Sequence, residues 1–489
     1  MESFLKDIIN LLSYNSHNPL LFSSGFFLWW FVIIFFGYIL LQNKQTIKLV
    51  YLTIISYYFF YKSGGIFFFI LFISTFVDFF VGKLLNITEK KSLRRLYLFL
   101  TLLVNLGLLS YFKYTNFFIN TINSVGGYSI KNLNIFLPIG ISFYTFQTLS
   151  YTIDIYRRKL EPAKSFLDFA FFVSFFPQLI AGPIVRASVF LPQIRKPVNI
   201  SKEDIGRAIF LITIGLFKKA VISDFISINF VDRVFDQPLL YSGVENLMAL
   251  YGYAVQIYCD FSGYSDMAIG MALLMGFRLT LNFNAPYKSA SITEFWRRWH
   301  ISLSSWLRDY LYISLGGNRK GKIRTYINLF ITMLLGGLWH GASWKFVIWG
   351  ALHGLALAIE KFFSALFPFR KNNVFTRLIS IFITFHFVCL CWIFFRADSY
   401  TTAFDMLNRI IFSFKPELAL QVIMAYSSVV GLIFLGLVLH FLPEKLDKFA
   451  EKLVTKSPLL IKSLILVIVI WIVIQVKSAE VQPFIYFQF

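Results

Sequence analysis

Residues 295–354 read FWRRWHISLSSWLRDYLYISLGGNRKGKIRTYINLFITMLLGGLWHGASWKFVIWGALHG. The first half is basic and glycine-rich, a composition that the apolar interior of a bilayer rejects. The second half contains an apolar run that ends in His340. Three of the chain's six histidines lie here: His300, His340 and His353. Because ionisable groups at membrane depth are usually functional, we expect this stretch to decide both the fold and the chemistry.

The composition is that of an integral membrane protein. Of the 489 residues, 57% are hydrophobic, 15% are charged and 60 are phenylalanine. Soluble domains average about 25% charged residues. Apolar runs long enough to cross the hydrocarbon core recur from end to end of the chain. We therefore predict an all-α polytopic protein, with residues 1–489 as a single domain of about eleven transmembrane helices plus re-entrant or in-plane helices.

The net charge of +21 indicates membrane topology rather than nucleic-acid binding. Lys and Arg cluster in short loops between apolar runs, as in the cytoplasmic loops of membrane proteins. The clusters at 83–95, 157–159 and 444–462, with Lys44 and Lys48, predict cytoplasmic loops and place both chain ends outside. The three cysteines lie in apolar surroundings and indicate neither disulfides nor a metal site. We expect no metal and no tightly bound cofactor.

His340 lies in LLGGLWHGASW, residues 334–344. A helix rising about 1.5 Å per residue would place it about 24 Å from Arg324, deep in the membrane. The small residues around it permit close helix packing or close approach of a substrate. His340 is therefore either a general base for a hydroxyl nucleophile or a histidine that only bonds to a neighbouring helix. His353, one span further on, is a weaker candidate for a supporting role.

The segment 287–325 is basic and aromatic. It suits a pair of amphipathic or re-entrant helices at the cytoplasmic headgroup level. The same composition would also suit a polyanionic donor, such as a thioester that carries a nucleotide. The two interpretations are compatible. The candidate donor contacts are Arg297, Arg298, Trp299 and Arg308, and His300 is either structural or a further donor contact.

The stretch QIYCDFSGYSDMAIG, residues 256–270, places two carboxylates among apolar residues. Carboxylates at membrane depth are costly unless they are paired or hydrated. We expect Asp260 and Asp266 to contact arginines of 287–325 or to line a polar tunnel, with a structural ion pair for at least one of them. The other candidate tunnel residues are Ser262, Trp339 and Ser343.

The chain ends in FIYFQF, residues 484–489. Chain ends normally fray in water, but this one is almost wholly aromatic. We therefore expect the tail, residues 478–489, to lie outside the cytoplasm and to seek an apolar groove or the membrane interface. Tyr486 carries the single hydroxyl group of the FIYFQF sequence.

Four stretches resemble the membrane-bound O-acyltransferase family, most closely its bacterial alginate and peptidoglycan O-acetylation branch. They are QIYCDFSGYSDMAIG, FWRRWHISLSSWLRDYLYISLGGNRKG, LLGGLWHGASWKFVIWGALHG and CWIFFRA, the last at 391–397. The resemblance implies a ring of transmembrane helices around a thinned centre, where a funnel from each side meets at the family histidine. That histidine maps onto His340.

The resemblance also implies the reaction. An acyl group carried as a cytoplasmic thioester, here expected to be acetyl-CoA, crosses to an extracytoplasmic acceptor. A periplasmic partner of the SGNH-hydrolase type then esterifies a polysaccharide hydroxyl. A tail motif of the form F-x-Y-x-x-F, matched by Phe484, Tyr486 and Phe489, is the implied acyl relay. We thus expect an O-acetyltransferase of a cell-envelope polysaccharide in the bacterial inner membrane.

Two alternatives remain. Within the family, the acyl group could be D-alanine from a carrier protein, as in teichoic-acid modification. From another class, the chain could be a transporter or flippase. That function would move a solute without an acetyl donor and would not depend on His340 or Tyr486.

Overall fold

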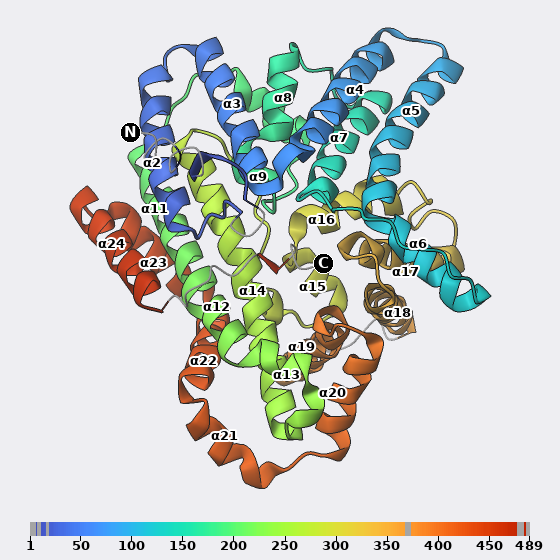
Figure 1. The fold of residues 1–489 in the computed structure, drawn as a ribbon, viewed down its shortest axis with the longest axis vertical. Helices are drawn as coiled ribbons and strands as arrows, with labels where there is room; N and C mark the ends of the chain where they lie inside the picture. Colours follow the sequence, from blue (N-terminus) through green and yellow to red (C-terminus); the bar gives the residue numbers. More distant parts are fainter. Residues whose placement is uncertain (1–5, 7–10, 16–18, 367–372, 477–483, 486–489) are drawn as a thin grey trace. The chain divides into compact units, whose positions relative to one another are not determined.

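A computed structural model of the chain describes residue 6 and residues 11–15, 19–366, 373–476 and 484–485 (Figure 1). The structure is 79% helical, and no strand occurs among these residues. The predicted all-α class is confirmed.

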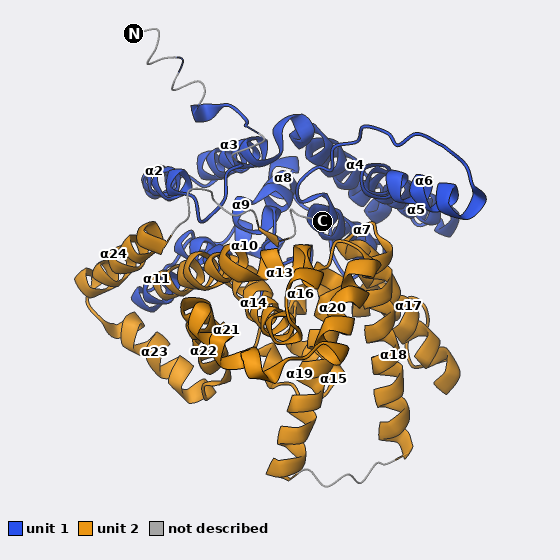
Figure 2. Ribbon diagram, turned by 60° about the horizontal axis from the view of Figure 1, so that its bottom comes forward, with its two compact units in different colours: residues 1–208, 267–280 blue, residues 209–266, 281–489 orange. Residues whose placement is uncertain are grey.

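The chain packs into two compact units (Figure 2). Unit 1 comprises residues 1–208 and 267–280, and unit 2 comprises residues 209–266 and 281–489. Each unit thus consists of two separate segments of the chain. Two of the boundaries between these segments fall inside continuous helices, α11 (Lys202–Leu216) and α14 (Gly243–Leu274). The expected single domain stays a prediction.

Unit 1 is a set of helices. Their bounds are α2 (Gly25–Leu41), α3 (Gln45–Gly64), α4 (Phe68–Ile87), α5 (Lys91–Leu109), α6 (Thr115–Gly126), α7 (Ile141–Tyr156), α8 (Phe166–Ser174), α9 (Phe176–Leu179) and α10 (Ala187–Ile194). Polar side chains hold α4, α5 and α7 together: the Asn105 amide donates to Asp78 at 2.9 Å, and Thr148 donates to Asn105 at 3.2 Å. Such interhelical hydrogen bonds stabilise helix packing where water is excluded.

Unit 2 holds the stretch around the three histidines. Its helices are α12 (Asp224–Ile226), α13 (Asp232–Asp236), α15 (Ile292–Arg298), α16 (Ile301–Trp306), α17 (Lys322–His340), α18 (Trp344–Leu366), α19 (Val374–Arg396), α20 (Tyr400–Phe412), α21 (Ala419–Ala425), α22 (Ser427–Phe441), α23 (Glu444–Lys456) and α24 (Leu459–Val476). Three π-helical turns, Phe217–Ser223, Ser227–Val231 and Leu307–Tyr312, interrupt the regular helices. The segment 287–325 thus contains a short helix pair, α15 and α16, as the sequence predicts.

Glycines bring α17 and α18 into backbone contact. A Cβ atom on Gly337 would lie against the carbonyl oxygen of Phe346 and 3.1 Å from the Cα of Gly350. A Cβ atom on Gly350 would in turn lie 2.5 Å from the carbonyl oxygen of Met333. Small residues at these positions let two helices approach closely. This contact fixes the position of His340, the last residue of α17, relative to α18.

Among the described residues, five helical stretches are long and apolar enough to cross a membrane. They are Gln45–Ile87, Lys91–Gly126, Trp344–Leu366, Val374–Arg396 and Leu459–Val476. A sixth is a pair, Pro416–Ala425 and Ser427–Phe441, bent by 96°. Together they fit a multi-pass membrane protein. The predicted number of crossings stays a prediction, since helices lined by protein, such as the almost wholly buried α7, need not be strongly apolar.

Candidate active site

His340 lies in an aromatic enclosure in unit 2. It is 3% exposed, and its imidazole packs edge-on against the rings of Trp339, Trp349 and Phe395, with centroid separations of 5.1, 4.9 and 5.3 Å. α17 supplies His340 and Trp339, α18 supplies Trp349, and α19 supplies Phe395. Rings on α17, α18 and α19 hold the imidazole in place and shield it from bulk water, which strengthens electrostatic interactions with it.

His353 continues this cluster along α18. Its ring is fully buried and lies 4.8 Å from the ring of Trp349. The indole Nε1–H of Trp296 donates to Nδ1 of His353 at 3.3 Å. An indole nitrogen only donates, so Nδ1 of a neutral His353 is the unprotonated nitrogen. Trp296, His353 and Trp349 therefore form a continuous series of rings that ends at His340.

His300 lies in the same unit and makes polar contacts of its own. It adopts left-handed backbone geometry, with φ of +44°, where α15 ends and α16 begins. Its Nδ1–H donates to the amide oxygen of Asn282 at 3.0 Å, and Ser302 donates to the same oxygen at 2.9 Å. Burial lowers the pKa of His300 to about 3, so the ring is neutral at physiological pH. Trp339, 6.1 Å from the His300 ring, also contacts His340.

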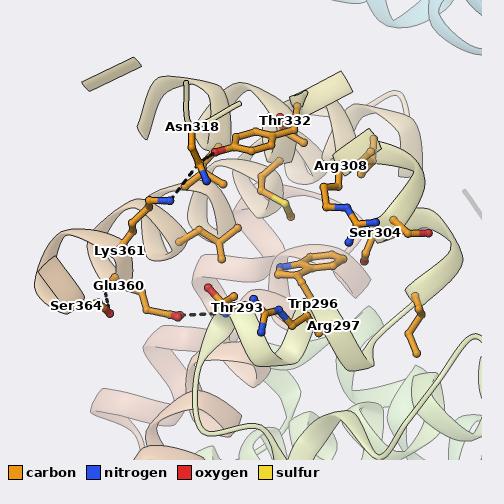
Figure 3. Close-up of a pocket in the computed structure, with 17 residues that line it drawn as sticks. Thr293, Trp296, Arg297, Ser304, Arg308, Asn318, Thr332, Glu360, Lys361 and Ser364 are labelled. Atoms are coloured by element: carbon orange, nitrogen blue, oxygen red, sulfur yellow. Dashed lines mark hydrogen bonds between the residues drawn. The ribbon is translucent and has the colours of Figure 1, made fainter. Parts of the chain in front are cut away.

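A cavity of about 510 Å³ opens beside these rings, between α15, α16, α17 and α18 (Figure 3). Its wall carries three cations, Arg297, Arg308 and Lys361, and one carboxylate, Glu360. Lys361 donates to the side chain of Asn318 at 3.2 Å. The remaining polar groups of the wall are Thr293, Ser304, Ser305, Tyr312, Asn318, Thr332 and Ser364. Trp296 is also part of the wall, so the ring series leads from this cavity to His340.

Charges around the cavity are partly balanced. Arg308 pairs with the adjacent Asp309 at 2.7 Å, and that hydrogen bond raises the pKa of the guanidinium. Glu360 accepts the backbone N–H of Thr293 at 3.0 Å and so fixes the start of α15. The exposed Arg297 and Lys361 leave the wall with an excess of positive charge. Such a wall favours an anionic occupant.

Two of the predicted donor contacts lie outside the wall of this cavity. Arg298 pairs with Glu294 at 2.9 Å, one turn earlier on α15. Trp299 is buried and packs on Phe283 and Trp392, with ring centroids 5.0 and 4.9 Å apart. The helix ends at Arg298 and the extended backbone of Trp299 follows, which turns the ring inward. Of the predicted set, the structure brings together Arg297 and Arg308.

The predicted carboxylates form ion pairs with lysines. Asp260 pairs with Lys219 at 2.5 Å, and Asp266 pairs with Lys218 at 2.8 Å. Lys219 also pairs with Asp224 at 2.8 Å. The expected ion pair is therefore present, but the expectation of arginine partners from 287–325 was wrong. The π-helical turn Phe217–Ser223 brings both lysines to α14.

The described part of the tail lies against this ion pair. The backbone N–H of Ile485 donates to Asp260 at 2.9 Å. Phe484 packs on Phe261 and Tyr264, with centroids 5.4 and 5.0 Å apart. Both tail residues are buried, as expected for an apolar groove. Tyr486 and Phe489 lie outside the described residues.

The other predicted tunnel residues are spread over unit 2. Ser262 is buried in α14, and Trp339 lies between His300 and His340. Ser343 is half-buried in the turn between α17 and α18, where its carbonyl oxygen accepts the N–H of Phe346 at 3.1 Å. Within the described parts of the chain, no three His, Cys, Asp or Glu side chains are grouped to hold a metal ion.

Sequence reasoning missed several residues of the site. Lys361, Glu360 and Thr332 reach the cavity from α17 and α18, within apolar helices that were interpreted only as spans. A signal was available, because Glu360 and Lys361 are adjacent charges near the end of an apolar run. Lys218 and Lys219, the partners of Asp266 and Asp260, were also missed.

Comparison with known proteins places this architecture among acyltransferases. The model of the membrane-bound O-acyltransferase family matches residues 5–401. The peptidoglycan O-acetyltransferase of Helicobacter pylori is 41% identical over 361 residues, covering 68% of this chain and 68% of that protein. The probable alginate O-acetylase AlgI of Pseudomonas aeruginosa is 48% identical over 323 residues, covering 65% and 60%. The teichoic acid D-alanyltransferase of Bacillus subtilis is 30% identical over 272 residues, covering 52% and 68%.

Proposed function

The chain belongs to the membrane-bound O-acyltransferase family, and we propose that it moves an acetyl group from a cytoplasmic thioester to an extracytoplasmic acceptor, for O-acetylation of a cell-envelope polysaccharide. The acetyl group is proposed because two relatives are named for O-acetylation, of peptidoglycan and of alginate. The donor we propose is acetyl-CoA. Membership of an enzyme family disfavours the transporter alternative.

The observation that carries this proposal is the link between the basic cavity and His340. Arg297, Arg308 and Lys361 give the cavity a charge that suits the phosphates of a nucleotide-bearing thioester. The ring series from Trp296 through His353 and Trp349 leads from the cavity wall to His340. A donor held by its phosphates could thus direct its thioester end toward the buried histidine.

In the proposed step, His340 acts as a general base. Its imidazole accepts the proton of a hydroxyl group while the hydroxyl oxygen bonds to the thioester carbonyl carbon. The C–S bond then breaks, and the departing sulfur takes that proton from the imidazolium. The products are an oxygen ester and a free thiol. His300 and His353 act as positioning residues in this scheme, because each contacts a tryptophan that packs on His340.

We propose Tyr486 as the first acceptor. The hydrogen bond from Ile485 to Asp260 supports this assignment, since it anchors the residue that directly precedes Tyr486 inside unit 2. The acetyl ester would then pass to a periplasmic partner of the SGNH-hydrolase type and on to the polysaccharide. The proposal places the protein in the bacterial inner membrane with both chain ends outside.

A second candidate is transfer of D-alanine from a carrier protein. The 30% identity to a teichoic acid D-alanyltransferase favours it. The higher identity to two proteins named for O-acetylation favours acetyl transfer.

One experiment separates these donors. Purified protein in nanodiscs is incubated with radiolabelled acetyl-CoA or with D-alanyl carrier protein, and free thiol and protein-bound label are measured. Acetyl transfer predicts thiol release from acetyl-CoA alone. Release only from the D-alanyl carrier would replace the proposed donor, and release from neither, with the acceptor partner present, would contradict both.

A further inference from the structure

Unit 1 contains a second cavity, of about 410 Å³, that the acyl-transfer chemistry does not use. Its wall is formed by the first turn of α3, the end of α10, the loop segment 196–199 after α10 and the loop segment 276–280 after α14. Among the residues that the structure describes, three cations line it, Lys48, Lys196 and Arg278, and no acidic residue does. Every one of these residues belongs to unit 1.

Lys48 is the unusual member. Its side chain is buried, with the residue 1% exposed, yet it lines the cavity. Among the described residues its ammonium has no carboxylate partner and no hydrogen-bond acceptor. A buried ammonium without a partner is destabilising, because nothing compensates for the loss of its hydration. The first turn of a helix adds to this cost, because the helix dipole disfavours a cation there.

A second polar group in the same wall also lacks a partner. The hydroxyl oxygen of Thr280 is buried and has no hydrogen-bond partner among the described residues. The loop around it is firmly held: the side chain of Gln193 accepts the backbone N–H of Arg278 at 2.8 Å and donates to its carbonyl oxygen at 3.0 Å. The guanidinium of Arg278 pairs with Asp204 at 2.9 Å. Lys48 and Thr280 are thus preformed, unsatisfied groups on a fixed wall.

We propose that this cavity binds the phosphate of an anionic phospholipid headgroup. A phosphate oxygen would pair with the Lys48 ammonium and accept the Thr280 hydroxyl proton, while Lys196 adds charge at the rim. Basic pockets beside membrane helices bind such headgroups. A free soluble phosphate has the same chemistry, but the surroundings favour a lipid. α3 begins an apolar stretch that is long enough to cross a membrane. Its residues Ile47, Val50 and Ile54 are exposed and could contact the acyl chains of a bound lipid.

The test compares the lipid dependence of thermal unfolding. Delipidated protein in detergent is titrated with phosphatidylglycerol, phosphatidylcholine or inorganic phosphate, and unfolding is followed by tryptophan fluorescence. The variants are Lys48→Met and Thr280→Val. Lys44→Met is the matched control, because Lys44 is exposed one turn earlier at the start of the same helix.

Phosphatidylglycerol should raise the Tm of the wild type and of K44M, while phosphatidylcholine and inorganic phosphate should not. K48M should weaken phosphatidylglycerol binding about tenfold or more, and T280V about threefold. Without lipid, K48M should melt no lower than the wild type, since it removes an unpaired charge. Unchanged lipid affinity in K48M would overturn the site.

Two other outcomes also decide the matter. Equal stabilisation by inorganic phosphate would overturn the lipid assignment in favour of a soluble phosphate. If K48M melts lower than the wild type without lipid, and T280V binds phosphatidylglycerol normally, Lys48 has a structural role only.

Discussion

The backbone N–H of Ile485 donates to the carboxylate of Asp260 at 2.9 Å, beside the Asp260–Lys219 ion pair. This bond holds the chain's last described residues inside unit 2. It connects two motifs that lie 225 residues apart in the sequence.

Asp260→Ala should release the tail. It leaves the Ile485 N–H without an acceptor, at a cost of about 1–3 kcal/mol, which corresponds to roughly 5- to 150-fold more tail opening. Carboxypeptidase digestion followed by intact mass measures this opening. Asp260→Asn keeps an acceptor oxygen and should open the tail less. Glu444→Gln, at an exposed position on α23, is the control. Digestion of D260A at the wild-type rate would refute the docking.

Removing a cation from the basic cavity should weaken donor binding without slowing chemistry. Arg297→Ala and Lys361→Ala should each raise the KM for acetyl-CoA about tenfold and leave kcat nearly unchanged. Salt should reduce the difference between variants and wild type, because these groups are exposed. Lys322→Ala, at the exposed start of α17 and outside the cavity wall, should match the wild type. A fall in kcat with unchanged KM would contradict the donor assignment.

Gly337→Ala should separate α17 from α18. The added Cβ meets the Phe346 carbonyl oxygen and the Gly350 backbone, neither of which can move easily. We expect a loss of about 1–3 kcal/mol in unfolding free energy and reduced activity, since His340 ends α17. Gly107→Ala on α5 is the matched control, because no atom of the described residues lies within 4 Å of its added Cβ. Denaturant unfolding checks both, and equal stability of the two variants would refute the close contact.

His300 should make the fold sensitive to acid. Its pKa is about 3 in the folded state, below the ordinary 6.5. The unfolded chain therefore binds a proton that the folded chain does not, and stability falls as pH drops from about 6.5 toward 3, by about 1.4 kcal/mol per pH unit for one proton. His300→Gln should reduce the slope of unfolding free energy against pH by the contribution of one proton. An unchanged slope in H300Q between pH 6 and pH 4 would show that His300 is not the titrating group.

The sequence could predict the features that depend on local composition. Apolar runs indicated the all-α membrane fold, and the alternation of Trp and Arg after residue 295 indicated the short helices α15 and α16. α15 carries Arg297, and the π-helical turn that follows α16 carries Arg308. An ion pair was predicted for at least one of the two carboxylates, but the lysine partner could not be, because Lys218 and Asp266 lie 48 residues apart and meet only through a π-helical turn. The sequence also placed Trp299 among the donor contacts, but its ring is turned inward. The cause is the end of α15 at Arg298, which composition does not indicate.

The central claim is that His340 activates the hydroxyl that receives the acetyl group. The most direct test is single-turnover cleavage of acetyl-CoA by purified wild type, His340→Gln and His386→Gln, with intact mass to follow acetyl on the protein. His386, on α19, bonds to Tyr251 and serves as the matched control. We predict that H340Q lowers the rate about 10²–10⁴-fold while remaining folded, and that H386Q is unaffected. Cleavage and acetylation by folded H340Q at the wild-type rate would contradict the account.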